Sequence, residues 1–395
     1  MKKHILVISQ YFYPEQFRIN DICQEWIKRE YRVTVLTGIP NYPEGKFYKG
    51  YGWFKKRKEN WNGIDIIRIP IISRGHSKVR LVLNYYSFVW SGWIWKTFTK
   101  LKPDLVFTFE TSPMTQALIG KWFSKRIKIP NYLYVQDLWP ENLEVVGGIH
   151  NKFILKHYQK MSDKIYAKCT KIFATSPSFV ETIQERVVDK EKVIYWPQYA
   201  EDIYKPVENP NPPEIPEDNR FKIIFTGNVG VAQGLDILPK VARLVDDVLF
   251  VIVGDGRYKK ELIKEVDDVK DKFLFLNRQP VDRIPELLCA CDVAFVSFMN
   301  NALFEKTIPA KLQSYMACGM PILASTSGET KRIIEEANCG ICCKLGNVEH
   351  LVVAINKMKE SDLGIFGNNS IAYSKAFFEK KILFDTFETI IFENN

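Results

Sequence analysis

A glycine-rich stretch over residues 225–236 holds the first residues that could do chemistry. It reads Phe-Thr-Gly-Asn-Val-Gly-Val-Ala-Gln-Gly-Leu-Asp, after a β-branched segment and before a helical one. Glycine lets the backbone approach a ligand closely, and a helix N-terminus offers unpaired N–H groups to a diphosphate. The stretch therefore predicts an anion-binding loop, with a plain strand-to-helix turn as the alternative; the loop contains Gly227, Asn228, Gly230, Gln233 and Gly234.

Two more segments follow predicted strands in the same half of the chain. Gly254 and Gly256 flank an aspartate directly after one strand, in a pattern that a simple turn also explains. Further on, Pro309 is expected in the first turn of a helix that ends near Cys318.

Polar residues around that helix could meet the same ligand. Glu305 precedes the helix, while Lys311 and Gln313 lie on it, and a surface helix with scattered polar residues is the alternative. Because all three segments follow strands of one domain, they are expected to converge at the carboxyl edge of its sheet. Arg278, after the strand predicted at 273–276, is assigned to the same ligand-binding set.

Short β-branched segments alternate with helical stretches along nearly the whole chain. Strands are predicted at residues 5–8, 33–36, 64–69, 105–109, 132–135, 171–174 and 192–195, and then at 221–226, 249–253, 273–276, 293–297, 321–324 and 340–343. Such alternation predicts parallel sheets that are covered by helices on both faces. The expected fold class is α/β, with two Rossmann-like doubly wound domains.

Six prolines without apolar periodicity interrupt the alternation between residues 196 and 219. We therefore expect a first domain at 1–200, a linker at 201–220 and a second domain at 221–375, as suits a chain of 395 residues. A C-terminal helix at 376–395 is expected to pack back toward the first domain. Two such domains turn their carboxyl-end crevices toward each other, so an interdomain cleft is the expected active site.

The net charge of +9 implies attraction to phosphate groups. The chain has no zinc-finger spacing, RNP-type run or basic helix with heptads, which argues against nucleic acid as a partner. Eight cysteines form no disulfide framework for a chain of this size, so a reducing, cytoplasmic compartment is expected. Cys339, Cys342 and Cys343 have no histidine nearby, which favours small buried residues over a metal or redox site.

An aromatic segment beside basic residues is the candidate membrane contact. Arg74, Lys78 and Arg80 precede a stretch with three tryptophans and two tyrosines at residues 81–96. This composition suits an interfacial helix, and a helix buried on the sheet is the alternative. No stretch reaches the ~20 apolar residues that a spanning helix needs, and the apolar run near the start is too short for a signal peptide.

Motifs in both halves occur in the same order as in a known family. The first half contains Tyr-Pro-Glu at 13–15 followed by Arg-Ile-Asn-Asp at 18–21, Thr-Gly-Ile-Pro-Asn-Tyr-Pro-Glu-Gly at 37–45, and Gln-Asp-Leu-Trp-Pro-Glu at 136–141. The second half contains the glycine loop and a segment from Glu305 to Gly-Met-Pro-Ile at 319–322. Over nearly its whole length the chain resembles the retaining glycosyltransferases of family 4, which have the GT-B fold. It is similar to their O-antigen and capsule branch, which includes N-acetyl-L-fucosamine transferases.

The resemblance implies a UDP-sugar as donor and an undecaprenyl-diphosphate-linked glycan as acceptor, at the inner face of the plasma membrane. The glycine loops, Arg278 and Lys311 would bind the donor, Glu305 would hold its sugar, and Gln313 would contact its ribose. Asp137 would orient the acceptor hydroxyl. The acceptor-binding residues implied are Glu15, Arg18, Asn41, Tyr42 and Glu141.

Three positions depart from the pattern of the family. Relatives commonly contact the diphosphate through Arg and Lys of the glycine loop, where this chain has Asn228 and Gln233. Lys311 could supply the missing charge. Gln313 stands where relatives have a second glutamate, and its amide can still hydrogen-bond a hydroxyl.

The sequence contains no Asp-x-Asp motif, so metal-dependent neutralisation of the diphosphate is not supported. Backbone N–H groups, a helix dipole and a cation would stabilise the leaving nucleotide instead. The resemblance implies no cofactor and no metal, and the departing phosphate would take the proton of the acceptor.

Two other functions stay open. A UDP-sugar 2-epimerase shares the architecture but would need carboxylates and histidines for proton transfer, and none of the five histidines lies in these motifs. A non-catalytic nucleotide-sugar binder is consistent with the departures at three positions. Donor hydrolysis or sugar transfer separates these alternatives.

Overall fold

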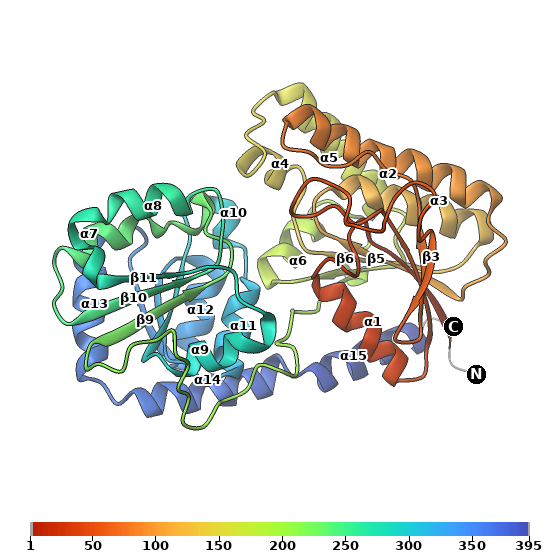
Figure 1. Cartoon of the computed structure of the whole chain (residues 1–395). Helices are drawn as coiled ribbons and strands as arrows, with labels where there is room; N and C mark the ends of the chain where they lie inside the picture. Colours follow the sequence, from red (N-terminus) through yellow and green to blue (C-terminus); the bar gives the residue numbers. More distant parts are fainter. Residues whose placement is uncertain (1–2, 394–395) are drawn as a thin grey trace. The chain divides into compact units, whose positions relative to one another are not determined.

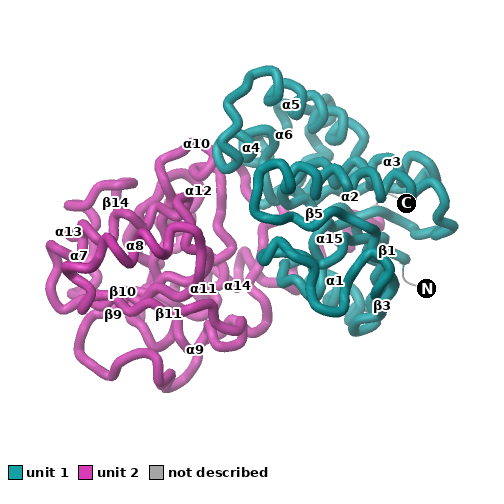
Figure 2. Tube along the Cα trace, turned by 45° about the horizontal axis from the view of Figure 1, so that its top comes forward, with its two compact units in different colours: residues 1–175, 179–195 teal, residues 176–178, 196–395 magenta. Residues whose placement is uncertain are grey.

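The computed structural model describes residues 3–393 and divides them into two compact units. The first unit runs to residue 175 and continues at 179–195, and the second comprises 176–178 together with the chain from 196 onward (Figure 2). Each unit is a sheet with helices on both faces (Figure 1). The predicted α/β class with two doubly wound sheets is therefore confirmed.

Within the described residues, the first unit contains an eight-stranded sheet with the order β3-β4-β2-β1-β5-β6-β7-β8. The strands are His4–Ile8 (β1), Arg32–Thr37 (β2), Lys58–Trp61 (β3), Ile64–Arg68 (β4), Leu105–Glu110 (β5), Asn131–Val135 (β6), Lys171–Ala174 (β7) and Val193–Tyr195 (β8). Strand order reverses between β1 and β5, because β2 lies on one side of β1 and β5 on the other. Ligands of open α/β sheets bind outside the carboxyl ends of the strands at such a switch point.

Strand β3 is absent from the sequence-based assignment. It pairs antiparallel with β4 at the edge of a sheet whose other pairs are parallel. Its residues are mostly polar because an edge strand buries little, so apolar patterning could not reveal it. The signal that was available is the Asn62-Gly63 turn, where both residues have positive φ (50° and 85°) as a tight hairpin requires.

Helices cover both faces of this sheet because strand side chains alternate between them. Leu6 and Ile8 of β1 pack with Phe88 and Phe123 on the face that carries α2 and α3. Trp26 of α1 meets Phe107 of β5 edge-on at 4.9 Å between ring centroids. The helices are Arg18–Lys28 (α1), Lys78–Phe98 (α2), Ala117–Ile127 (α3), Glu141–Val145 (α4), Lys152–Tyr166 (α5) and Pro177–Gln184 (α6).

The second unit is built around a parallel six-stranded sheet in the order β11-β10-β9-β12-β13-β14, counted over the described residues. Its strands are Phe221–Thr226 (β9), Val248–Val253 (β10), Phe273–Leu276 (β11), Val293–Ser297 (β12), Ile322–Ser325 (β13) and Gly340–Cys343 (β14). Strand order reverses between β9 and β12. The glycine-rich loop after β9 therefore lies at the switch point of this sheet.

The helices of the second unit divide between the two faces of its sheet. Leu238 of α7, Leu262 of α8 and Ile355 of α13 share one cluster with Ile223 and Phe225 of β9. Leu287 of α9, Leu312 of α11 and Ile333 of α12 share the other with Ile224. The helices are Leu238–Ala242 (α7), Lys259–Glu265 (α8), Ile284–Cys289 (α9), Ala302–Glu305 (α10), Ala310–Ala317 (α11), Gly328–Ala337 (α12), Val348–Glu360 (α13), Leu363–Phe377 (α14) and Lys380–Glu393 (α15).

The segment predicted as a linker packs on the second unit. Ile215 is buried in its core, and Glu214 pairs with Arg283 at 3.0 Å. The indole nitrogen of Trp196 donates to the carbonyl of Leu383 in α15 at 2.8 Å. Residues 196–220 and α15 thus belong to the second unit by their contacts, whereas the sequence pattern suggested a separate linker.

Candidate functional site

The loop after β9 has the backbone geometry that the sequence predicted for a ligand cradle. Gly227 and Gly234 have φ of 125° and 60°, which residues with a side chain adopt only under strain. A Cβ at Gly234 would lie 2.7 Å from the carbonyl oxygen of Phe298. The loop is therefore pressed against the segment that follows β12, on the other side of the switch point.

The loop after β10 is fastened directly to the glycine loop. Gly254 has φ of 141°, and a Cβ there would overlap the carbonyl oxygen of Gly227. A Cβ at Gly256 would overlap the carbonyl of Val229, whose N–H donates to Asp255 O at 2.9 Å. Both glycines are thus required by backbone-to-backbone contact, so the structure brings the first two predicted segments together.

Lys311, at the start of α11, extends its ammonium group beneath the glycine loop. The ammonium donates to Oε1 of Gln233 at 2.5 Å and lies 3.7 Å from the ring centroid of Phe225. Among the described residues no carboxylate contacts it, and burial lowers its pKa to about 7. Burial of a cation without a counterion costs free energy, so binding of an anion next to the Lys311 ammonium would be favourable.

A second lysine of the same unit, Lys259, has a purely structural role. Lys259 is buried, and its ammonium donates to the carbonyls of Gly254 (2.7 Å) and Leu276 (2.9 Å) and to the side chain of Asn277 (3.1 Å). It joins the ends of β10 and β11 and is saturated by protein oxygens. Sequence analysis did not select it, although its place just after Gly256 was a signal.

Glu305 lies at the end of α10 with an exposed side chain, and its Oε1 accepts a hydrogen bond from Ser327 Oγ at 3.1 Å. Gly328, with φ of 61°, passes so close to the Glu305 backbone that any Cβ would overlap the Glu305 carbonyl. The loop after β13 therefore contacts both the carboxylate and the backbone of Glu305. Ser327 and Gly328 are functional candidates that sequence analysis missed.

Gln313 is placed differently from the other predicted contacts. Its side chain is fully buried, and its amide nitrogen donates to the carbonyls of Pro309 (2.9 Å) and Ala310 (3.1 Å) in the orientation that satisfies the amide. In this structure it stabilises the first turn of α11. Asn228 and Arg278, by contrast, have exposed side chains beside the carboxyl ends of β9 and β11.

In the first unit, Glu15 connects two loops that follow neighbouring strands of the sheet. Its carboxylate is buried and accepts backbone N–H groups of Asn41 (2.7 Å), Tyr42 (2.6 Å) and Phe12 (3.3 Å). Burial raises its pKa to about 7, and the three N–H donors oppose that rise. Glu15 thereby ties the loop after β1 to the loop after β2.

Buried amides extend this connection to α2 and to the loop after β5. The side-chain amide of Gln10 donates to Oδ1 of Asn84 at 2.7 Å, and the backbone N–H of Gln10 donates to Oε1 of Gln116 at 2.8 Å. Asn84 in turn reaches Oδ1 of the buried Asn41 at 3.4 Å. These amides follow strand ends or interrupt an apolar helix, which is the signal that sequence analysis missed.

Aromatic rings and one cation border these loops. Tyr11 stacks on Phe17 at 5.1 Å, and Tyr42 contacts both rings at 5.6 and 5.3 Å between centroids. The guanidinium of Arg74 donates to Tyr11 Oη at 2.9 Å and lies 5.2 Å from the centroid of Tyr42. Sequence analysis grouped Arg74 with cations that could contact a membrane. In the structure its side chain is half-buried among phenol rings.

Asp137 and Glu110 bring two carboxyl groups to the ends of β6 and β5. Asp137 is half-buried and accepts the backbone N–H of Ser112 at 2.7 Å. Glu110 is fully buried, and burial together with the charge of Asp137 raises its pKa well above the usual range. The backbone N–H of Asp137 opposes this rise in the Glu110 pKa. Burial also raises the pKa of Asp137. One proton is thus readily retained by this pair, a feature that the sequence did not reveal.

Two other predicted acceptor residues lie at the starts of helices. Arg18 begins α1 and is half-buried, and Glu141 begins α4 with Arg186 at 3.9 Å. The carboxylate of Glu15 accepts hydrogen bonds from the backbone of Asn41 and Tyr42. Tyr85 lies near Asp137, whose charge contributes to the rise of the Tyr85 pKa.

Helix α2 buries one narrow stripe and exposes a broad apolar surface. Trp90 is 65% exposed and Phe98 78%, so the helix is not simply a buried cover of the sheet. Tyr86 bonds Tyr158 of α5 at 2.8 Å, and Phe153 at the start of α5 is 87% exposed. We call this surface of α2 and α5 the aromatic face. No helix in residues 3–393 is both long and apolar enough to cross a membrane.

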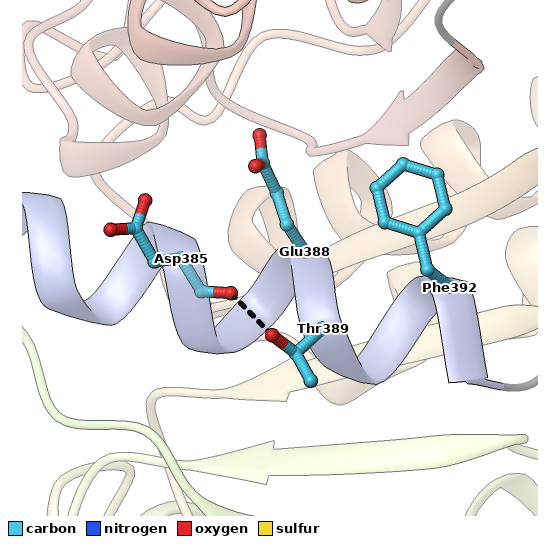
Figure 3. A pocket seen from close by; sticks show the side chains of 4 residues that line it. All are labelled: Asp385, Glu388, Thr389 and Phe392. Carbon is cyan, nitrogen blue, oxygen red and sulfur yellow. Dashed lines mark hydrogen bonds between the residues drawn. The ribbon is translucent and has the colours of Figure 1, made fainter.

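Two other features do not form a nucleotide or metal site. A hollow along α15 is lined by Asp385, Glu388, Thr389 and Phe392 (Figure 3), where Thr389 Oγ1 donates to the Asp385 carbonyl at 3.0 Å. Its two carboxylates would repel a diphosphate, so it does not suit a nucleotide. Within the part of the chain that the structure covers, no three His, Cys, Asp or Glu side chains are grouped as metal ligands.

The two halves of the chain match two family models. Residues 16–198 match the Glycosyl transferase 4-like domain, and residues 208–375 match Glycosyl transferases group 1. Together they cover the loops around Asn41 and Asp137 in the first unit and those around Gly227 and Glu305 in the second.

Individual proteins are similar over most of their length. WcaI of Escherichia coli K12, a glycosyl transferase assigned to colanic acid biosynthesis, is 25% identical over 357 residues, which is 84% of this chain and 86% of WcaI. Sucrose-phosphate synthase from Thermosynechococcus elongatus has a TM-score of 0.78 at 14% identity over 100% of both chains. Anabaena HepE in complex with UDP has a TM-score of 0.71 at 16% identity over 100% of both chains. The chain therefore consists of a glycosyl transferase 4-like domain followed by a glycosyl transferases group 1 domain, and it is a glycosyltransferase with the GT-B fold.

Proposed function

We propose that this glycosyltransferase is a retaining enzyme that moves a sugar from a UDP-sugar to a lipid-linked glycan in the synthesis of a surface polysaccharide such as O-antigen or capsule. The observation that carries the proposal is the ammonium of Lys311, which lies beneath the glycine loop without a carboxylate partner. The proposal assigns the donor to the second unit and the acceptor to the first.

The diphosphate of the donor would occupy the space between the glycine loop and Lys311. Backbone N–H groups of that loop and one cation replace the Arg and Lys that the related family uses there. Glu305, supported by Ser327, would hold hydroxyls of the donor sugar. Arg278 would contribute a second positive charge from the end of β11.

A UDP-sugar is favoured by the similarity to HepE, whose structure contains UDP, and a polysaccharide product by the similarity to WcaI. N-acetyl-L-fucosamine or a related N-acetyl sugar is the first candidate for the transferred group.

The proposed reaction needs no cofactor. The acceptor hydroxyl would attack the anomeric carbon from the side of the leaving diphosphate. The bond between that carbon and the phosphate oxygen would break, the new glycosidic bond to the acceptor would form, and the departing phosphate would take the hydroxyl proton. Asp137, which lies near the buried carboxyl group of Glu110, would orient the hydroxyl. Glu15, Asn41 and Tyr42 would shape the acceptor site through the loops that they join.

The aromatic face supports binding to a membrane surface that carries the lipid-linked acceptor. Contiguous exposed apolar patches are unusual on a monomer surface. Here Trp90 stacks on Trp93 at 5.5 Å between ring centroids, and both share a helix with the exposed Phe98 and with Lys78 and Lys96. Lys96 lies 5.7 Å from the ring of Trp93. Aromatic rings next to cations suit the boundary between headgroups and acyl chains of an anionic membrane.

The test is a thermal-shift screen of UDP-, GDP- and dTDP-sugars, followed by product analysis with the stabilising donor. A ligand at a hundred times its dissociation constant stabilises the folded state by about 2.7 kcal/mol. A transferred sugar with the same anomeric configuration as the donor would support the proposal. Isomerised donor without transfer would identify an epimerase, and binding without any turnover would identify a non-catalytic binder.

A further inference from the structure

Arg74 differs from two buried arginines of the first unit, each of which pairs with a carboxylate. Arg68 is 1% exposed and pairs with Glu59 at 2.6 Å, and Arg186 is 9% exposed and pairs with Asp163 at 2.9 Å. Arg74 is also drawn into the fold, but its polar contact is with the phenol of Tyr11. No Asp or Glu of the described chain pairs with it, so its positive charge is not neutralised by the protein.

The Arg74 guanidinium is held in place and still has hydrogen-bond donors to offer. Its backbone N–H donates to Asn41 Oδ1 at 2.8 Å, and the Tyr42 ring lies 5.2 Å from the guanidinium carbon. Arginine carries five N–H donors, of which one is used by Tyr11. Tyr42 itself is 37% exposed, so ligand can approach beside this pair. A fixed guanidinium with unused donors is the geometry that binds phosphate in a two-pronged manner.

Further positive charge gathers next to Arg74. Arg80 donates to Ser73 Oγ at 3.2 Å, directly beside Arg74 in the chain, and its side chain packs against Gly75. Lys78 and Arg80 occupy the first turn of α2, which contains no acidic residue. Cations at a helix N-terminus repel the positive end of its dipole, and an anion bound there would remove that repulsion.

We propose that Arg74, assisted by Arg80, binds the diphosphate group of the lipid-linked acceptor. The inference rests on the proposed function and names the residues that recognise the charged part of its acceptor. It removes Arg74 from the set of membrane-binding cations and leaves that role to the aromatic face. Tyr42 would then contact the first sugar attached to the diphosphate.

The test measures binding of farnesyl diphosphate and of inorganic pyrophosphate to the full chain by calorimetry, with the donor site saturated by UDP. Wild-type protein should bind both probes, and Arg74→Gln should weaken both at least tenfold. Arg74→Lys, which keeps the charge but loses the two-pronged geometry, should weaken them two- to tenfold and serves if the first variant is unstable. Arg32→Gln, which removes the same charge at the amino end of β2, is the matched control and should have no effect.

A third ligand distinguishes the diphosphate from membrane phospholipid. Binding to phosphatidylglycerol vesicles should change less than twofold in Arg74→Gln. Equal affinity of wild type and Arg74→Gln for farnesyl diphosphate would overturn the inference, as would a loss confined to vesicle binding. UDP affinity and donor hydrolysis, measured on the same variants, report on the proposed function separately, because they do not depend on Arg74.

Discussion

Replacement of Lys311 by methionine should stabilise the second unit and at the same time remove donor binding. The fall of the Lys311 pKa from its ordinary 10.5 to about 7 corresponds to about 5 kcal/mol at 1.36 kcal/mol per pKa unit. Partial exposure of the side chain and the Phe225 ring reduce this cost, so we expect Lys311→Met to raise the free energy of unfolding by about 2 kcal/mol at pH 6.

The sign of the pH dependence follows from the direction of the pKa shift. Between pH 7 and 10.5 the unfolded chain binds more protons than the folded one at this residue, so wild-type stability rises with pH. Below pH 7 the lysine is charged in both states and the full cost is present. The advantage of Lys311→Met should therefore shrink to about 1 kcal/mol at pH 9.

Hydrogen exchange of amides in β9 and β12 measures this stability in the second unit alone. Calorimetry of UDP binding should show a loss of tenfold or more in Lys311→Met at pH 6, since a hydrogen bond to a charged group contributes about 1.5–3 kcal/mol. Wild-type affinity should fall as pH rises above 7, and the affinity of the variant should be independent of pH.

Lys259→Met is the matched control, because Lys259 is a buried lysine of the same unit whose ammonium is bonded to three protein oxygens. It should lower the free energy of unfolding by about 1–3 kcal/mol, since buried acceptors lose their donor. If Lys311→Met destabilised the unit as Lys259→Met does, or if it bound UDP as well as wild type, the role assigned to the Lys311 charge would be refuted.

Three further variants test other parts of the proposal. Glu305→Ala should lower kcat/KM by about 10- to 150-fold through loss of a charged hydrogen bond to the donor sugar, with the fold unchanged by circular dichroism; wild-type turnover would reject that contact. Asp137→Asn should reduce turnover about a hundredfold while UDP affinity, read by calorimetry, is retained. Weaker UDP binding in this variant would assign Asp137 to the donor instead. Replacement of Trp90 and Trp93 by serine should weaken sedimentation with anionic vesicles about tenfold and leave turnover of a water-soluble acceptor unchanged; equal sedimentation would contradict membrane binding by the aromatic face.

Local patterns in the sequence were sufficient for most strands and for the glycine loops. A buried parallel strand must be a short β-branched run, and a glycine after it signals a close backbone approach, as at Gly227 and Gly254. Strand β3 was not predicted because, as an edge strand, it contains no short β-branched run.

Contacts between distant residues could not be inferred in the same way. Lys311 donates to Gln233, which lies 78 positions earlier in the chain. The sequence alone therefore could not show that Lys311 has no carboxylate partner. Arg74 lies in a basic run that resembles a membrane-binding segment, and only its contact with Tyr11, 63 positions away, shows that it turns inward. Glu15 was selected by its motif, yet its part in joining two loops depends on N–H groups of Asn41 and Tyr42.

The direct contact between the backbones of the Gly227 and Gly254 loops has a consequence for engineering donor choice. A Cβ at Gly254 would force the loops apart, and Gly227 has a φ of 125° that residues with a side chain adopt only under strain. A mutant library that varies these two glycines would therefore consist mainly of damaged proteins. Variation is better directed to Asn228 and Arg278, whose exposed side chains lie beside the same strand ends. Donor preference could then change one side chain at a time over an unaltered frame, and natural diversification of such enzymes would face the same restriction.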